Sequence, residues 1–243
     1  MNQTKARTSA DFFEKTIGAL VAEDYRTSAV FEKHGIDFCC GGQKTLKESC
    51  REKGIDPAVI HQEIEAAKSA QIEREQNYAI WKLPFLADYI INIHHAYLNE
   101  NTEKIRAYAH KIAEVHGVKH PEVIEIATIF DKISTDMASH LREEEEVLFP
   151  AIKRSVAAQK AGDSPAVKDR EVIKASLKKL RDEHEEIGDA IHAIRTLAKD
   201  YLIPENVCNT FVVTYQKLKE FEDDLHKHVH LENNILFPKA AQL

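Results

Sequence analysis

The chain has 243 residues, a net charge of −7 and 43% hydrophobic residues, with only 8 Gly and 7 Pro. This composition allows a sizeable core, and the few turn-forming residues argue against an all-β fold. Lysines and arginines scattered along an acidic chain disfavour nucleic acid as a partner, because phosphate binding needs a basic face. Apolar runs fall far short of the roughly 18 residues that span a membrane, and no basic start precedes an apolar block as in a signal peptide. We therefore expect a cytoplasmic protein without a membrane partner.

Residues 1–70 are predicted to form a small helical domain. One helix ends where Gly35 supplies a stop signal. The sequence DFCCGG follows, and Thr45 and Glu48 then have the spacing of a capping box that begins another helix. The polar residues 71–82 are predicted to link this domain to the next.

Residues 83–243 are predicted to form four long helices. Short connections near 116–121, 159–169 and 200–204 imply antiparallel neighbours, so the fold class is all-α with an antiparallel four-helix bundle. Apolar residues recur every three or four positions along the last three helices, as on one helical face. Polar residues interrupt these apolar faces. On the second helix, Val147 is expected to continue the apolar face after the polar residues. The interrupting residues are His140, Glu144, His184, His228 and Glu232.

On the first helix, His95 shares a face with Leu98, Ile105 and Ile112, but His94 fits a neighbouring face almost as well.

Two segments of the bundle repeat. HLREEEEVLFP at residues 140–150 and HVHLENNILFP at residues 228–238 share H-x-x-x-E and a final Leu-Phe-Pro. The His and the Glu of the two motifs are each 88 residues apart, and His95 precedes His184 by 89. The stretch from His95 to the first turn and the stretch from that turn to His140 each span about 33–35 Å of helix. The four histidines and two glutamates are therefore expected to meet in one layer of the core.

Such a layer needs a cation. A lone buried histidine is more often a hydrogen-bonded core residue, but the repeated motif and the matched heights favour ligands. An unpaired carboxylate in an apolar core costs several kcal/mol, and no Lys or Arg lies on these faces. Six nitrogen and oxygen ligands are too many for one zinc ion, whereas two ions bridged by carboxylates fit. Imidazole with carboxylate suits iron or manganese.

Neighbouring residues are interpreted as structural. Glu143, Glu145 and Glu146 are read as solvated, and His226 and His230 as surface residues because they point about 200° away from His228. Cys50 and Cys208 match no motif and are read as small core residues.

The chain resembles the hemerythrin-like domain and, with DFCCGG near its start, the iron–sulfur cluster repair di-iron proteins of the ScdA/YtfE family. The resemblance covers nearly the full length. It implies two non-haem iron ions, oxo- or hydroxo-bridged when ferric, with Glu144 and Glu232 bridging. It favours His95 over His94, since the family ligand follows an Asp-x-Ile-Ile segment. The implied ligands are His95, His140, Glu144, His184, His228 and Glu232.

The resemblance also implies repair of iron–sulfur clusters damaged by nitrosative or oxidative stress, by supplying iron or handling NO. The partners would be proteins with damaged clusters and the small molecules NO, O₂ or peroxide, and a homodimer is compatible with the sequence. Cys39 and Cys40 match the family's cysteine pair, and thiolates beside a Gly-Gly turn would bind iron or NO. The alternatives are an NO- or peroxide-reducing enzyme and an oxygen or redox sensor.

Overall fold

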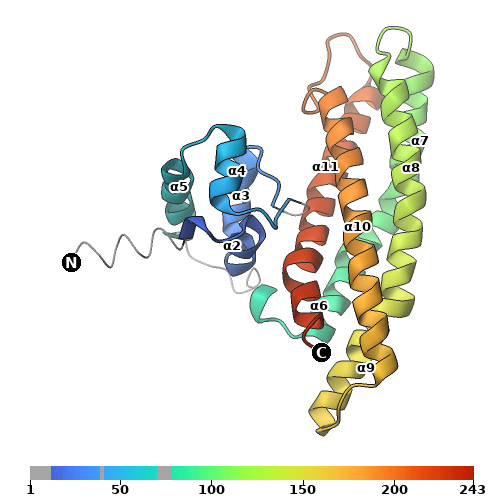
Figure 1. Cartoon of the computed structure of the whole chain (residues 1–243). Helices are drawn as coiled ribbons and strands as arrows, with labels where there is room; N and C mark the ends of the chain where they lie inside the picture. The colour runs from blue at the N-terminus through green and yellow to red at the C-terminus, as the bar shows by residue number, and fades with distance from the viewer. Residues whose placement is uncertain (1–11, 39–40, 70–77) are drawn as a thin grey trace. The chain divides into compact units, whose positions relative to one another are not determined.

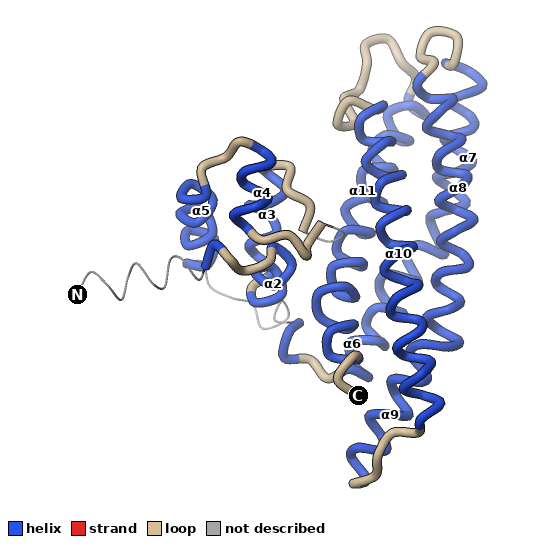
Figure 2. Tube along the Cα trace, viewed as in Figure 1, coloured by secondary structure: helices blue, strands red, loops and turns tan. Residues whose placement is uncertain are grey.

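The computed structural model describes residues 12–38, 41–69 and 78–243. Helices supply the regular structure of these residues (Figure 2), apart from one isolated β-bridge between Thr16 and Thr45. The prediction of an all-α fold is confirmed. None of the described helices combines the length and apolar character needed to cross a bilayer.

Contacts divide the chain into two compact units. The first comprises Met1–Lys82 together with Val229–Lys239, and the second comprises Leu83–His228 together with Ala240–Leu243. The predicted domain limits stay a prediction, and most of the predicted linker, residues 71–77, lies outside the described residues.

The first unit is built from short helices with apolar inner faces. Gly35 adopts φ +62° just after the second of them, in the left-handed region that favours glycine. The predicted capping box is present, because Glu48 donates its backbone N–H to Thr45 Oγ1 at 3.2 Å and accepts from the Thr45 N–H at 2.9 Å. The described helices of this unit are α2 (Ile17–Glu23), α3 (Ser28–Lys33), α4 (Leu46–Lys53) and α5 (Pro57–Ser69), with 3₁₀ turns η1 (Tyr25–Thr27) and η3 (Tyr78–Ile80).

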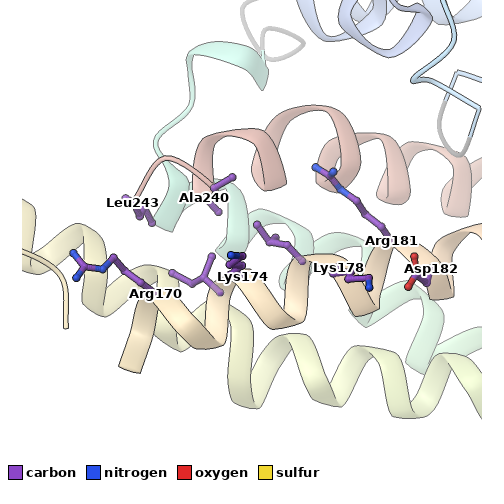
Figure 3. A pocket seen from close by; sticks show the side chains of 10 residues that line it. Arg170, Lys174, Lys178, Arg181, Asp182, Ala240 and Leu243 are labelled. Atoms are coloured by element: carbon purple, nitrogen blue, oxygen red, sulfur yellow. The ribbon is translucent and has the colours of Figure 1, made fainter. Parts of the chain in front are cut away.

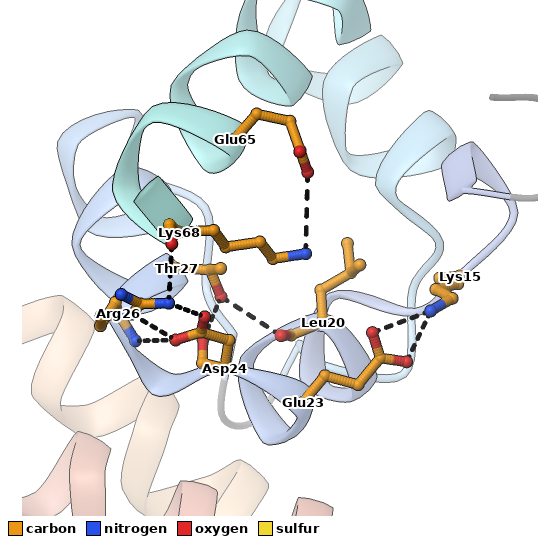
Figure 4. A network of polar contacts seen from close by, with 8 residues as sticks. All are labelled: Lys15, Leu20, Glu23, Asp24, Arg26, Thr27, Glu65 and Lys68. Carbon is orange, nitrogen blue, oxygen red and sulfur yellow. Dashed lines mark hydrogen bonds and ion pairs between the residues drawn. The ribbon is translucent and has the colours of Figure 1, made fainter. Parts of the chain in front are cut away.

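A polar network fixes the turn between α2 and α3 (Figure 4). Asp24 accepts hydrogen bonds from the backbone N–H of Arg26 at 3.2 Å and from Arg26 Nε at 2.9 Å. Arg26 also donates to the carbonyl oxygen of Lys68 at 3.1 Å, which connects the turn to the end of α5. The hydrogen bonds from Arg26 hold the pKa of Asp24 below its ordinary value.

The second unit contains four long helices that lie side by side (Figure 1). Their inner faces pack as predicted, and the rings of Phe130 and Phe221 meet at 5.1 Å between centroids. The long helices are α7 (Ala96–His116), α8 (Glu122–Glu143), α10 (Val167–Leu197) and α11 (Asn209–Leu231), whose last residues pass into the first unit. Shorter helices precede or extend them: α6 (Leu83–Tyr89), α9 (Phe149–Ala161) and α12 (Phe237–Ala240).

Three π-helical turns interrupt these helices: η4 (Ile90–His95), η5 (Glu144–Leu148) and η6 (Glu232–Leu236). At η5 the N–H of Phe149 donates to the carbonyl of Glu144, five residues back, and Pro150 follows without an N–H to donate. A proline ring also crowds the carbonyl four residues back, so a wider turn accommodates Leu-Phe-Pro. The helix therefore continues through this wider turn into α9.

The widened turn changes which residues face the core. One extra residue per turn rotates everything beyond it by about 100° relative to an α-helix. Leu148 is therefore fully buried, whereas Val147 is 36% exposed. The prediction that Val147 continues the core face was wrong for this reason.

Candidate metal centre

Six buried polar side chains form two groups of potential metal ligands. In each group the nitrogen and oxygen atoms all lie within 4.8 Å of one another. Both groups contain Glu144 and Glu232, and every member is at most 2% exposed. One group adds His95 and His228, and the other adds His140 and His184. The structure thus brings together the residues that the repeat predicts to meet.

The local helix geometry explains how each motif aims two side chains at one point. Glu144 follows His140, and Glu232 follows His228, by one turn of a continuous helix. Glu144 Oε2 lies 3.5 Å from His140 Nε2 and 3.3 Å from Nε2 of His95 on a different helix. The carboxylate therefore lies among imidazole nitrogens rather than among apolar groups.

Two further carboxylates orient the histidines from outside the layer. His95 Nδ1 donates to Glu145 Oε1 at 2.7 Å, and His140 Nδ1 donates to Glu183 Oε2 at 2.9 Å. A proton on Nδ1 leaves Nε2 as the lone-pair nitrogen that turns inward, as in metalloproteins where a carboxylate holds the ligand histidine. The hydrogen bond from His140 holds the pKa of Glu183 below its ordinary value. Glu145 was wrongly read as merely solvated, and Glu183 was missed.

His94 takes a different position from His95. Its ring is 1% exposed and lies parallel to His228, with an angle of 4° and 5.7 Å between centroids. Its Nδ1 is 2.9 Å from Asp224 Oδ1. Both histidines are buried residues of the π turn η4, but only His95 belongs to a ligand group found among the described residues.

The sequence also led to predictions for His230 and for the cysteines. His230 is fully buried rather than on the surface, since the rings of Tyr25 and Phe38 lie within 5.8 Å of it in the first unit. Burial lowers the pKa of His230 to about 3. Cys50 is buried as predicted, but Cys208 is exposed, so its reading as a core residue was wrong. Cys39 and Cys40 lie outside the described residues.

Comparison with known proteins agrees with this geometry. Residues 86–240 match the hemerythrin HHE cation binding domain, and residues 13–68 match a domain of unknown function, DUF542 or ScdA_N. The iron-sulfur cluster repair protein ScdA of Staphylococcus epidermidis is 31% identical over 230 residues, which cover 94% of this chain and 99% of that protein. The chain belongs to the ScdA/YtfE family. The repair protein YtfE of Yersinia pestis is 28% identical over 232 residues, covering 96% of this chain and 99% of that protein.

Membership of the ScdA/YtfE family supports metal binding by the bundle. The matched cation-binding domain spans all six residues of the two groups. Their donor chemistry fits iron, because imidazole and carboxylate oxygen are the ligands that non-haem iron takes in proteins. Two carboxylates common to both groups also suit two ions better than one.

Proposed function

We propose that this chain is a di-iron protein that repairs iron–sulfur clusters damaged by nitrosative or oxidative stress. The observation that carries the proposal is the sharing of Glu144 and Glu232 between the two ligand groups. A carboxylate with two oxygens can bridge two ions, and two bridges hold the ions as a pair. His95 and His228 would complete one ion, and His140 and His184 the other.

The net charge of the loaded centre would be the same in its two oxidation states. Two ferrous ions with two carboxylates leave a charge of +2, and two ferric ions with an added oxide bridge leave the same charge. The centre when loaded would supply one-electron chemistry at each iron, or iron itself as cargo for a damaged cluster. The chain's own part is to hold six ligands in a water-poor layer and to orient the imidazoles through Glu145 and Glu183.

The family comparison adds the substrate class. The similar proteins from Staphylococcus and Yersinia are named iron-sulfur cluster repair proteins, and the chain covers nearly all of their length. We extend that role to this chain, with proteins carrying damaged clusters as its partners. Cys39 and Cys40 are proposed to take part by binding iron or NO, since paired thiolates have affinity for both.

A repair assay tests the proposal. The protein would be purified without oxygen, and its iron content and the visible spectrum of an oxo-bridged ferric pair measured after oxidation. The iron-loaded protein would then be added to an enzyme whose cluster NO has destroyed. We expect its activity to return, and no return with the Cys39→Ser, Cys40→Ser variant if the thiols take part. Absence of iron, or an enzyme that stays inactive with the wild type, would refute the proposal.

The number of protein ligands favours a second candidate function, that of a di-iron reductase. Each ion would receive two nitrogens and two shared carboxylates, which leaves coordination positions for small molecules. A di-iron enzyme could use them to reduce 2 NO, with two electrons and two protons, to N₂O and water, or to reduce peroxide. Catalytic N₂O formation from NO and a reductant would support this candidate. A sensor would instead bind a partner in response to ligand, without turnover.

A further inference from the structure

A groove in the second unit lies apart from the ligand groups. Its volume is about 570 Å³, and it runs between α10 and the C-terminal residues Ala240, Ala241 and Leu243. Figure 3 shows Ala240 and Leu243 facing the row of side chains that α10 contributes. The volume is that of a typical ligand-binding cleft.

The rim of the groove is basic although the chain is acidic overall. Arg170, Lys174, Lys178 and Arg181 line it from α10, with Asp182 as the acidic lining residue. Their spacing of three or four residues places them in one row, which covers about 16 Å along the helix. Arg170, Lys174 and Lys178 form no ion pair with any residue that the structure describes.

The floor of the groove is apolar. Ile173 and Leu177 lie beside the basic row on the same helix, and they are 3% and 7% exposed. Leu243 closes the other side. An apolar strip parallel to a row of positive charges is complementary to a ligand with an apolar face and a row of negative charges.

We propose that this groove binds an acidic amphipathic helix of a client protein. A fatty-acid-like ligand carries one carboxylate and would neutralise one of four cations, whereas a helix with acidic residues one turn apart would meet the whole row. Its apolar face would lie against Leu243, with the nearly buried Ile173 and Leu177 at the base of the groove, in the helix-in-groove mode of recognition. The assignment of the partner as a client rests on the proposed repair function.

The position of the groove suits that role. Lys178 precedes His184 by six residues on α10, which is about 9 Å along the helix axis. A client segment bound along the basic row would therefore reach from about 21 Å at Arg170 to within about 10 Å at Lys178 of the candidate metal layer, measured along α10.

A labelled peptide tests the groove without any use of the metal. The probe is a fluorescein-tagged peptide of Glu, Leu and Ala, about 18 residues long to allow a helix, with leucines on one face and glutamates one turn apart beside them. Binding is followed by fluorescence anisotropy with the full chain at low and high salt. A scrambled peptide of the same composition and a Lys-for-Glu version are the comparison probes.

The charge-reversal variant is Lys174→Glu, Lys178→Glu, and both side chains are exposed, so folding should not change. The matched control is Lys119→Glu, Lys160→Glu, which alters net charge equally at exposed lysines outside the groove. We expect the variant to bind the peptide at least about tenfold more weakly and the control to stay within about twofold of wild type. High salt should weaken wild-type binding, since the contact is electrostatic at the surface.

Several results would overturn the inference. These are no binding of the amphipathic peptide by the wild type at low salt, equal binding by the charge-reversal variant, or equal binding of the scrambled peptide. Binding to anionic phosphatidylglycerol vesicles in place of the peptide, or self-association lost in the charge-reversal variant, would assign the groove to a lipid or to a second copy. Full repair activity in the charge-reversal variant would show that the partner of the groove is not a client protein. Failure of iron-loaded wild type to restore a damaged enzyme would instead refute the proposed function and leave the peptide result standing.

Discussion

The Nε2 atoms of His140 and His184 lie 3.0 Å apart, on two buried rings that come from α8 and α10. Two imidazole lone pairs repel each other at that distance unless a proton or a cation lies between them. Because His140 already donates through Nδ1 to Glu183, its Nε2 is the nitrogen available for a metal ion. The metal ion proposed above would supply that cation.

Replacing the shared carboxylate should empty the site without unfolding the bundle. Glu144→Gln keeps the shape of the side chain but removes a charge that both groups use, so we expect iron content to fall below half of the wild-type value. Far-UV circular dichroism should be unchanged, because the buried charge is lost together with its counter-ion. Glu146→Gln, at an exposed position two residues away, is the control and should retain full iron. Wild-type iron content in Glu144→Gln would contradict the assignment.

Neighbouring histidines should respond differently to the same substitution. His95→Ala removes a member of a ligand group and is expected to lose iron, whereas His94→Ala should keep it. His94→Ala still leaves a cavity beside the ring of His228, so its thermal midpoint is expected to fall. Metal analysis and thermal melts of the two variants check this, and the reverse order of iron loss would reassign the ligand to His94.

The outer carboxylates should tune metal affinity rather than create it. Glu183→Gln weakens the acceptor for His140 Nδ1, and we expect affinity for iron to fall by about 10- to 100-fold. Competition with a chromogenic chelator measures the change. Glu185→Gln on the exposed side of α10 serves as the comparison and should compete like the wild type. An unchanged Glu183→Gln would show that the carboxylate is only a surface partner.

Cys208 should be the more reactive of the two described thiols. It is exposed, its Sγ lies 3.1 Å from His116 Nε2, and hydrogen bonds from the backbone of Phe211 and Thr210 hold its pKa below the ordinary value. Burial raises the pKa of the Cys50 thiol. Iodoacetamide labelling of a Cys39→Ser, Cys40→Ser background, mapped by mass spectrometry, should therefore modify Cys208 first. Labelling at similar rates would count against an activated thiolate, and His116→Gln should slow the reaction.

Acid should remove the contribution of the ion pair that joins α9 to α10. Arg154 donates to Asp169 at 2.6 Å, and this hydrogen bond holds the pKa of Asp169 below its reference value of 3.8. A lowered folded pKa stabilises the fold above that reference value and ceases to do so as the pH falls through the folded pKa. At pH 7 Asp169→Asn should lower the thermal midpoint by about 2 °C, with a gap that begins to narrow below about pH 4 and closes as the pH falls through the folded pKa. The control is Asp163→Asn, at an exposed residue in the loop between α9 and α10, and it should melt like the wild type at every pH.

The inner layer of the site could be predicted from the sequence because helical geometry is regular. H-x-x-x-E places two side chains on one face, and equal leg lengths return His140 to the height of His95. The repeat supplied the second half of the layer. These relationships depend only on residue spacing, so the placement of the six side chains followed from it.

The surroundings of the layer could not be predicted in the same way. Glu145 and Glu183 are about one-third exposed, and an acidic residue on a helix of this chain is usually solvated, so only the fold shows that they accept from His95 and His140. The burial of His230 depends on Tyr25 and Phe38, about 200 residues earlier in the chain. Spacing along one helix carries no information about such partners.

The three π turns have a consequence for how this fold tolerates insertions and deletions. Each of η4, η5 and η6 holds one residue beyond the α-helical count, so the helix beyond it turns a different side to the core. Helix α10 has no such turn, and its buried face runs unbroken from Ile173 to Ile194 through His184. Loss of one residue within η5 would let the helix regularise while α9 keeps its present face toward the core, because the wide turn already holds the residue that is removed. The same loss within α10 would have no wide turn to absorb it and would displace His184 itself.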